Sequence, residues 1–166
     1  MSDTTGPQGR LVRSRPRGLM RALLRFPIWL YRLGLGWIFD KRFLLLTHIG
    51  RRTGLPHQAV VEIVDHDAVR NTYVIASGWG RRSDWYRNIR KTPQVTVQVG
   101  RQSWTMIAVP LNPQEAAAAL GAYAHRYPRA FRALARGMLG QVSADLDVAV
   151  QETAQVVPLI ELRPYP

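Results

Sequence analysis

The segment FLLLTHIGRRTGLPHQAVVEIV, residues 43–64, predicts two strands joined by a charged turn. Residues 43–49 form a compact apolar run, and residues 58–64 are rich in β-branched side chains. The turn GRRTG, residues 50–54, combines two glycines with two arginines and a hydroxyl. Glycines permit a tight turn, and arginine pairs with phosphate through two parallel hydrogen bonds. We therefore expect an anion-binding loop with exposed backbone N–H groups, and a solvated basic turn is the alternative interpretation.

Short strands and helices are predicted on the C-terminal side of this pair. The hairpin signal Gly100-Arg101 separates two of the strands, and the turn at residues 65–71 separates two others. Pro158 predicts an edge strand or a bulge in the last one. Six short strands joined mostly by turns indicate an antiparallel barrel. The strands are expected at residues 43–49, 58–64, 72–76, 95–99, 103–109 and 156–162, and the helices at 84–91 after a Ser83 cap, at 113–126 after an Asn112 cap, and from Pro128 to residues 137–140.

The positive charge of the chain is concentrated in two regions. The net charge is +12; residues 1–42 carry nine Lys/Arg against two acids, residues 43–110 nine against four, and residues 111–166 five against five. A basic excess implies an anionic partner, which could be lipid, nucleic acid or a phosphorylated ligand. The absence of cysteine excludes disulfides, a thiol nucleophile and thiolate–metal sites, and it fits a reducing cytoplasm.

The N-terminal region predicts an appendage to the barrel domain of residues 41–166. Residues 1–16 have the composition of a disordered basic tail, and residues 17–40 form an amphipathic basic helix with Arg17, Arg21 and Arg25 on one face. Trp, Leu and Phe on the other faces suit the surface of an anionic bilayer. Arg21, Arg25 and Arg32 interrupt the apolar stretch of residues 19–39 and so prevent a transmembrane span. We expect a cytoplasmic protein bound peripherally to the inner face of the membrane; a helix docked on the core is the alternative.

A second cluster, SGWGRRSDWYRN at residues 77–88, leaves a strand, bends at two glycines and enters a helix. Ser77 and Gly78 stand where a backbone can approach a flat ring and bond its polar edge. Trp85 and Tyr86 can form the walls of a ring pocket, and the three arginines can neutralise an anion. An ordinary loop with Trp85 packed in the core is the alternative interpretation.

The two clusters in series resemble the deazaflavin-dependent nitroreductase family. The resemblance covers about residues 20–165 and includes a Tyr127-Pro128 pair after an Ala-rich helix and the closing segment VVPLIEL. It implies an α+β fold, the split β-barrel related to FMN-binding proteins. It also implies an oxidoreductase that uses coenzyme F-420, a reduced deazaflavin, as hydride donor.

Roles for individual residues follow from the resemblance. Arg51, Arg52 and Thr53 would hold the phosphate and acidic tail of the coenzyme, and Ser77 and Tyr127 would face the substrate, although a packing tyrosine is equally compatible with the sequence. The remaining residues expected along the coenzyme are His57, Gln58, Ala59, Val60, Val61, Glu62, Ile75, Ala76, Ser77, Gly78, Asp84, Trp85, Tyr86, Arg87 and Asn88. No metal site is expected, because the four histidines are scattered.

The acceptor is less well defined. Ala130 and Phe131 stand where nitroimidazole-reducing relatives carry tyrosines, Gly78-Trp79 replaces a lysine of some members, and residues 141–155 have no assigned role. We expect hydride transfer to a hydrophobic acceptor such as a quinone, an enone or an unsaturated lipid, with nitro compounds as further candidates. Two alternatives are a barrel that binds FMN, haem or lipid, and a non-catalytic module for anionic membranes or nucleic acid. Nucleic acid is disfavoured because the aromatic residues cluster locally.

Overall fold

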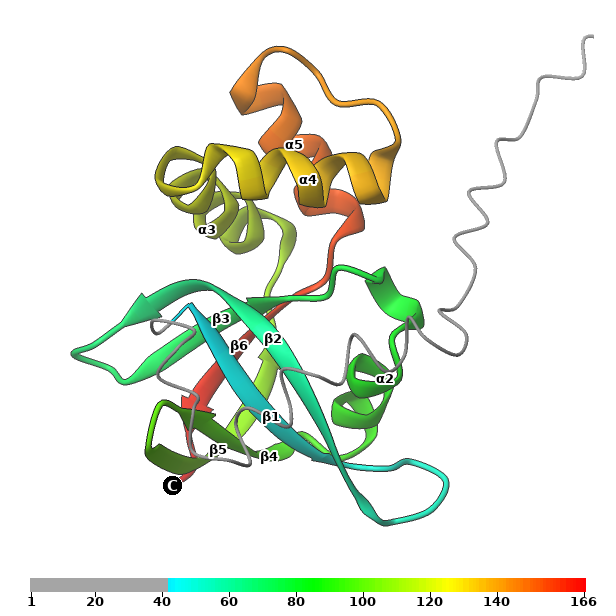
Figure 1. Ribbon diagram of the computed structural model, residues 1–166, viewed down its shortest axis with the longest axis vertical. Helices are drawn as coiled ribbons and strands as arrows, with labels where there is room; N and C mark the ends of the chain where they lie inside the picture. The colour runs from blue at the N-terminus through cyan, green and yellow to red at the C-terminus, as the bar shows by residue number, and fades with distance from the viewer. Residues whose placement is uncertain (1–41) are drawn as a thin grey trace, which may run out of the picture.

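Six antiparallel strands close into a barrel in the computed structural model, which describes residues 42–166 (Figure 1). Around the barrel the strands follow the order β1-β2-β3-β6-β5-β4. The predicted α+β barrel is therefore confirmed, whereas the tail of residues 1–16 and the helix of residues 17–40 lie outside the described residues. The strands are β1 Phe43–Ile49, β2 Pro56–Asp67, β3 Thr72–Ala76, β4 Gln94–Val99, β5 Gln102–Pro110 and β6 Leu159–Pro164.

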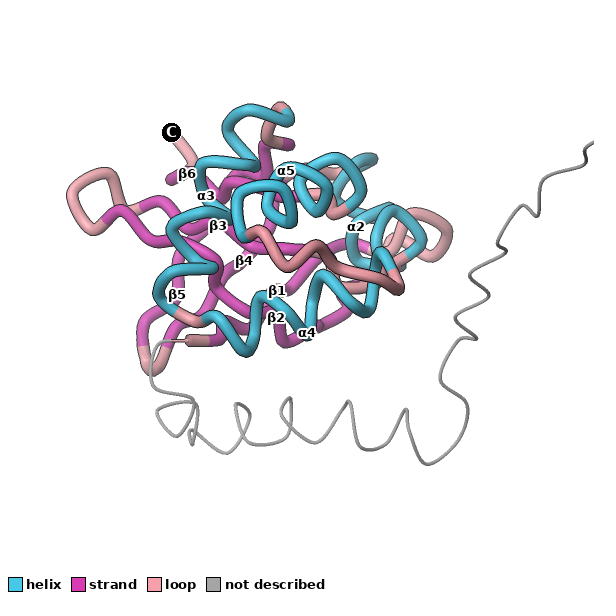
Figure 2. Tube along the Cα trace, turned by 90° about the horizontal axis from the view of Figure 1, so that it is seen from above, coloured by secondary structure: helices cyan, strands magenta, loops and turns pink. Residues whose placement is uncertain are grey.

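Three helices form a layer over the barrel, and a fourth lies apart from them. Figure 1 shows α3, α4 and α5 stacked beyond one end of the sheet and α2 beside β1, and Figure 2 shows the three helices lying across the strands. The α3 cap is formed as predicted, because Asn112 Oδ1 accepts from the N–H groups of Gln114 and Glu115. The segment that had no assigned role supplies α5. The helices are α2 Asp84–Lys91, α3 Pro113–Arg126, α4 Pro128–Leu139 and α5 Leu146–Val156, with a short 3₁₀ helix η2 at Gly80–Arg82.

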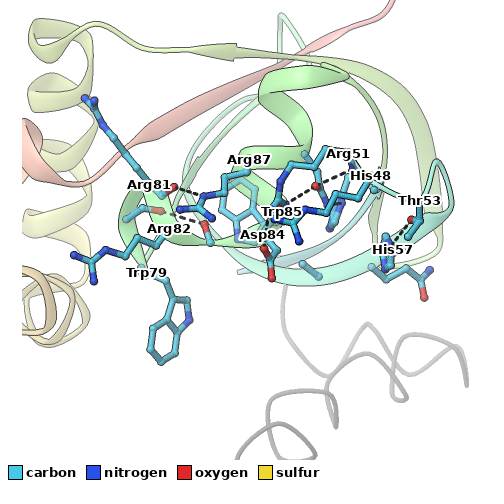
Figure 3. Close-up of a pocket in the computed structure, with 18 of the residues that line it drawn as sticks. His48, Arg51, Thr53, His57, Trp79, Arg81, Arg82, Asp84, Trp85 and Arg87 are labelled. Carbon is cyan, nitrogen blue, oxygen red and sulfur yellow. Dashed lines mark hydrogen bonds and ion pairs between the residues drawn. The ribbon is translucent and has the colours of Figure 1, made fainter. Parts of the chain in front are cut away.

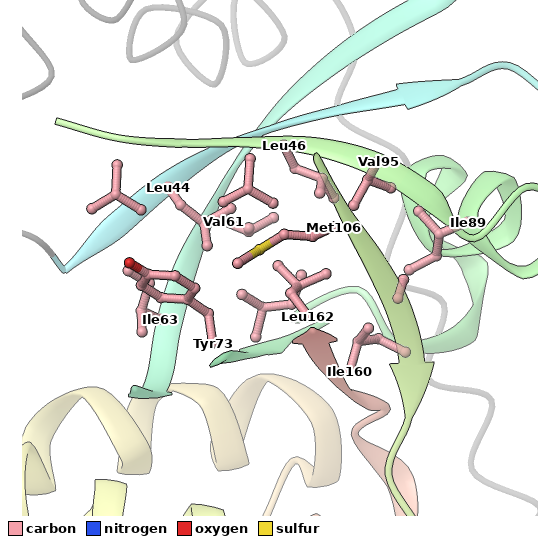
Figure 4. Close-up of a cluster of buried hydrophobic side chains, with 14 residues drawn as sticks. Leu44, Leu46, Val61, Ile63, Tyr73, Ile89, Val95, Met106, Ile160 and Leu162 are labelled. Atoms are coloured by element: carbon pink, nitrogen blue, oxygen red, sulfur yellow. The ribbon is translucent and has the colours of Figure 1, made fainter. Parts of the chain in front are cut away.

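The barrel interior is filled by aliphatic side chains from every strand (Figure 4). Alternation along β1 buries Leu44 and Leu46, and alternation along β4 buries Val95, Val97 and Val99. Each fully buried side chain of this size contributes about 2 kcal/mol through removal from water. This packed interior provides the rigid frame for the loops at the barrel end.

A β-bulge in β2 connects the barrel to the helical layer. Ile63 pairs with Ile75 while Asp65 pairs with Val74, so that Val64 is an extra residue between them. Ile63 is buried in the barrel interior, and Val64 is buried among α3, α4 and α5. Two consecutive residues of one strand therefore belong to two different cores.

Two strand boundaries differ from the sequence prediction by three residues, and the other strand ends by two at most. β6 begins at Leu159 because α5 continues to Val156. The expected edge or bulge at Pro158 is wrong: β6 lies between β3 and β5 with regular pairing to both, and Pro158 precedes it. β2 extends to Asp67, where a turn was predicted from residue 65, because its last residues continue to pair with β3. Among residues 42–166, no helix is both long enough and apolar enough to cross a bilayer.

Candidate functional site

A cavity of about 960 Å³ opens at the end of the barrel where the two sequence clusters meet (Figure 3). It is bordered by the β1–β2 loop, by the β3–α2 segment and by the adjoining parts of α4 and α5. Its size is at the upper end of the range for small-molecule sites, about 300–1,000 Å³. Five arginines line it against a single carboxylate, that of Asp84: Arg51, Arg52, Arg81, Arg82 and Arg87.

The β1–β2 loop is a tight turn that uses much of its own hydrogen-bonding capacity. The N–H of Gly50 donates to the Leu55 carbonyl and that of Gly54 to the Gly50 carbonyl, each at 2.8 Å. Gly54 has a positive φ of 68°, which glycine adopts without strain. A Cβ on Gly50 would lie 2.6 Å from Thr53 Oγ1 and 2.7 Å from His57 Nε2. An anion would therefore contact mainly the side chains of this loop, whereas an open row of backbone N–H groups was expected from the sequence.

Arg51 connects this loop to α2. Its Nη1 donates to Asn88 Oδ1 at 2.9 Å, its Nη2 lies 3.1 Å from Asp84 Oδ1, and its backbone N–H donates to Asn88 Oδ1 at 3.1 Å. Lys91 Nζ donates to the Arg51 carbonyl at 2.9 Å. The neighbouring Arg52 is exposed and makes no hydrogen bond or ion pair with another described residue. Arg51 thus holds the loop in place, and Arg52 is the arginine available to a ligand.

Asn88 also contacts His48 at the end of β1. Its Nδ2 lies 3.1 Å from His48 Nδ1, and both side chains are 4% exposed. The ring of His57 stacks beside His48 with centroids 6.0 Å apart. Burial, followed by the nearby His57, lowers the pKa of His48 to about 4. His48 is therefore an uncharged polar group in the wall of the cavity at neutral pH.

The segment from Ser77 to Ser83 is held by its own buried hydroxyls. Ser77 Oγ donates to the Gly80 carbonyl at 2.7 Å and lies 2.6 Å from Ser83 Oγ, which is 3.1 Å from the same carbonyl. The predicted Ser83 cap is wrong in one respect: Ser83 occupies the N-cap position of α2, but its hydroxyl makes these contacts and leaves the helix N–H groups uncapped. The network fixes η2 and directs the side chains of Arg81 and Arg82 outward (Figure 3).

The apolar side chains of the cavity are gathered at its other end. Trp79, 39% exposed, lies after β3, and Met138 of α4 and Val156 of α5 complete this part of the lining. Gly80 allows the close approach of α4, because a Cβ there would lie 2.9 Å from Met138 Cε. The end of the cavity beside the β1–β2 loop therefore carries Arg51 and Arg52, whereas the end beside the helical layer combines these apolar side chains with Arg81 and Arg82 of η2 (Figure 3).

The structure brings together more than half of the predicted site residues. The predicted residues that line the cavity are Arg51, Arg52, Thr53, His57, Gln58, Ala59, Gly78, Asp84, Trp85, Arg87 and Asn88. Ser77 is fully buried and does not line the cavity, and its hydroxyl donates to the Gly80 carbonyl of its own loop. The predicted residues that do not line the cavity are Val60, Val61, Glu62, Ile75, Ala76, Ser77, Tyr86 and Tyr127. Within the described part of the chain, no group of three His, Asp or Glu side chains is placed to hold a metal ion.

Glu62 and Tyr127 form a separate cluster on the outer side of β2. Arg42 Nη2 lies 2.6 Å from Glu62 Oε1, and the Arg42 guanidinium stacks 4.4 Å from the centre of the Tyr127 ring. Burial, with a further contribution from the Glu62 carboxylate, raises the pKa of Tyr123 far above its usual value. In this arrangement Tyr127 faces Arg42 and the helical core, so its predicted substrate contact remains a prediction.

Several lining residues were absent from the predicted set. His48 had a usable signal, because it continues the inward alternation of Leu44 and Leu46 and directly precedes the glycine turn. Met138 and Val156 had none, since only the packing of α4 and α5 against the barrel end brings them near Trp79.

Comparison with solved structures places the fold among split barrels. An F420-H2 Dependent Reductase (FDR-A) is 17% identical, with a TM-score of 0.53 over 74% of this chain and 95% of that one. A conserved hypothetical protein from Mycobacterium tuberculosis (14% identity, TM-score 0.54, 82% and 80% coverage) is also similar. So is the haem storage protein HutZ from Vibrio cholerae (14% identity, TM-score 0.53, 86% and 91% coverage). At these identities the likeness concerns the fold alone. A comparison with curated proteins finds no matching relative.

The family comparison is more specific than the fold. The model of the family described as F420H(2)-dependent quinone reductase matches residues 31–152, which include the β1–β2 loop, the Ser77–Asn88 segment and helices α2 to α4. The donor set of the cavity fits such a coenzyme, because its arginines suit a phosphate-bearing tail. The chain therefore belongs to the F-420-dependent quinone reductase family and is an oxidoreductase that uses coenzyme F-420.

Proposed function

We propose that this oxidoreductase transfers a hydride from reduced F-420 to a hydrophobic acceptor of the quinone class. The observation that carries the proposal is the lining of the cavity, in which five arginines are combined with an apolar surface that is gathered at the end beside the helical layer. A coenzyme with an anionic tail requires the arginines, and an apolar acceptor requires the apolar surface. Enones and unsaturated lipids have the same requirement and are further members of this substrate class.

Separate groups of residues would serve the two ends. Arg52, Thr53 and His57 would bind the anionic tail, while Arg51 would hold their loop against α2. The backbone at Gly78, the residue of this segment that lines the cavity, would approach the deazaflavin ring beside Trp85. Arg81, Arg82 and Arg87 would add positive charge to the cavity without an acidic partner among the described residues, since Asp84 is paired with Arg51.

The chemistry of the reaction is supplied mainly by the coenzyme when it is bound: F-420 in its reduced form yields a hydride and a proton, and the quinone takes up both to become a hydroquinone. The protein would then bind and orient the two reactants and keep water from the transfer path. Trp79, Met138 and Val156 would provide the apolar surface on which the acceptor lies. Because the coenzyme supplies both the hydride and the proton, the reaction requires no catalytic acid or base from the chain.

Coenzyme binding is the direct test. Purified protein is titrated with F-420 while deazaflavin fluorescence is followed, and we expect saturation at micromolar concentration. Arg52→Ala should weaken binding about tenfold, because it removes a charged donor. Arg90→Ala removes an exposed arginine of α2 that does not line the cavity and serves as the control. No saturation for the wild-type protein would disprove the proposed function.

The acceptor is tested with the reduced coenzyme under anaerobic conditions. Quinones with apolar side chains should oxidise it in the presence of the enzyme, and Trp79→Ala should raise KM for these quinones more than for a short polar quinone. Equal effects on both would contradict an apolar acceptor site. Nitroimidazoles should be poor substrates, because Ala130 and Phe131 have no hydroxyl where nitroimidazole-reducing relatives carry tyrosines, and Phe131 is also fully buried in the helical core.

A barrel that binds FMN or haem instead of F-420 would reveal itself by its ligand. Protein purified from its native host should carry no chromophore with an FMN or haem spectrum, and the presence of either would favour that alternative.

Peripheral membrane binding through residues 17–40 also belongs to the proposal, because it would bring the cavity to a lipid-dissolved acceptor. The double variant Arg21→Glu and Arg25→Glu should lose flotation with anionic liposomes while retaining coenzyme binding.

A further inference from the structure

His48 occupies the wall of the cavity with a hydrogen-bonding pattern that fixes which ring nitrogen carries its proton. It lines the cavity, is 4% exposed, and has Nδ1 directed at Asn88 Nδ2, 3.1 Å away. None of the roles assigned above involves it. The question is whether Nδ1 accepts or donates in this contact, because the other nitrogen must then do the opposite in a neutral ring.

The orientation of the Asn88 amide answers this question. Its Oδ1 receives two donors from Arg51, the backbone N–H at 3.1 Å and Nη1 at 2.9 Å. Both groups are donors only, so the atom facing them must be the amide oxygen. The atom facing His48 is therefore the amide nitrogen, which can only donate. His48 Nδ1 consequently accepts, and in the neutral ring the proton is on Nε2.

Burial is the main factor that keeps the ring neutral. Burial and the neighbouring His57 lower the pKa of His48 to about 4, and Asp84 opposes this shift only in part. A second proton would also bring an N–H on Nδ1 against the amide N–H of Asn88. Flipping that amide would remove the acceptor from both Arg51 donors. The three side chains therefore select one protonation state of His48.

His48 is left with one N–H for a ligand. Its Nε2 makes no hydrogen bond with any residue from 42 to 166, although its ring borders the cavity. The neighbouring groups Arg51, Thr53 and His57 line the end beside the β1–β2 loop. A donor beside these groups would face the part of the ligand that the β1–β2 loop binds.

We propose that His48 is a coenzyme-binding residue that donates a hydrogen bond from Nε2 to an oxygen of the anionic tail of F-420. Asn88 and Arg51 are the positioning residues that fix its tautomer. The proposal rests on the proposed function for the identity of the ligand, whereas the tautomer is a property of the free protein.

Nuclear magnetic resonance tests the tautomer directly. With ¹⁵N-labelled histidine, long-range ¹H–¹⁵N spectra at pH 7 should show His48 protonated at Nε2 alone, and F-420 should shift that nitrogen. A proton at Nδ1, or an Nε2 signal unchanged at saturating F-420, would overturn the proposal. Asn88→Ala should produce a mixture of tautomers, which a purely structural Asn88 would not.

Two substitutions separate the nitrogens. His48→Asn keeps an acceptor near Nδ1 but removes the Nε2 donor, so F-420 affinity should fall about tenfold. His48→Gln places an amide N–H near Nε2 and should bind within threefold of wild type. Neither should change the affinity for a deazaflavin nucleoside that lacks the phosphate tail. His125→Asn changes an exposed histidine of α3 outside the cavity and is the matched control.

The outcomes distinguish the two claims. If the wild-type protein does not bind F-420, the proposed function and the donor role fail together. If the wild-type protein binds F-420 and His48→Asn binds it equally well, the donor role alone is overturned. Equal loss of affinity for the tail-less deazaflavin would place His48 at the ring and overturn its assignment to the tail.

Discussion

The loop of residues 50–54 and the segment of residues 77–83 border the same cavity but are held by different means. The first is fastened by side chains of α2, through the buried Asn88 and the partly exposed pair of Arg51 and Asp84. The second is fastened by its own serine hydroxyls inside the protein. One attachment therefore contains groups that respond to pH and salt, and the other contains none. We call them the α2 attachment and the serine attachment.

The largest expected effect is the acid sensitivity of the α2 attachment. His48 has a pKa of about 4 in the folded protein and about 6.5 when unfolded. Between these values the unfolded chain binds more protons, so stability is complete above pH 6.5 and is lost as the pH falls toward 4. The loss attributable to His48 should reach about 3 kcal/mol.

Urea denaturation at a series of pH values from 4 to 7 measures this effect. His48→Asn should flatten that part of the profile, and His125→Asn should leave it as in the wild type. Wild-type and His48→Asn curves that are parallel over this range would mean that His48 is not the group responsible.

Asn88→Ala should break the α2 attachment at its centre. It removes the shared acceptor of two Arg51 donors and the partner of His48, all in a largely buried setting. We expect a loss of about 2–3 kcal/mol in the free energy of unfolding, together with weaker F-420 binding. Chemical denaturation measures the first and fluorescence titration the second. Arg90→Ala on the same helix should change neither, and an equally stable Asn88→Ala protein would contradict this account.

The serine attachment should fail only when both hydroxyls are removed. In Ser77→Ala the Ser83 hydroxyl still reaches the Gly80 carbonyl, and in Ser83→Ala the Ser77 hydroxyl does. Each single change should cost about 1 kcal/mol, and the double change should exceed the sum by about 1 kcal/mol. A double-mutant cycle in urea measures the coupling, and strict additivity would show that the hydroxyls act independently.

The smallest effect is expected for Asp84→Asn. The Asp84 side chain is 65% exposed, so its ion pair with Arg51 is screened by solvent and should contribute under about 0.5 kcal/mol. The difference between wild type and variant should shrink further as salt is raised from about 0.05 to about 0.5 M, because the added ions screen the attraction between the two exposed charges. A large, salt-independent loss would mean that Asp84 is as important to the attachment as Asn88.

The sequence predicted those strands and helix starts that are determined by residues adjacent in the chain. The first and third strands were predicted with the observed bounds, α3 began after its predicted Asn112 cap and α4 began at the predicted Pro128, because alternation, capping and proline at a helix start are local signals. Residues of the GRRTG and SGWGRRSDWYRN clusters line one cavity, and their binding roles remain predictions. Their residues are close in sequence, so their grouping did not depend on the packing of distant elements.

What escaped prediction depends on contacts between distant elements. The sequence could not show that Arg51 holds the loop while Arg52 stays available to a ligand. Arg51 is fixed by its hydrogen bond to Asn88, which lies on a helix that follows the third strand. The apolar surface of the cavity required Met138 and Val156 to meet Trp79. The edge expected at Pro158 was wrong because closure of the barrel leaves β6 between two neighbours.

The bulge at Val64 has a consequence for cooperativity. Because Ile63 and Val64 belong to two cores, the helices cannot separate from the barrel without also disturbing the pairing of β2 with β3. Loss of one layer would expose apolar surface on the other and weaken the strand common to both. The barrel and the helical layer should therefore behave as a single folding unit.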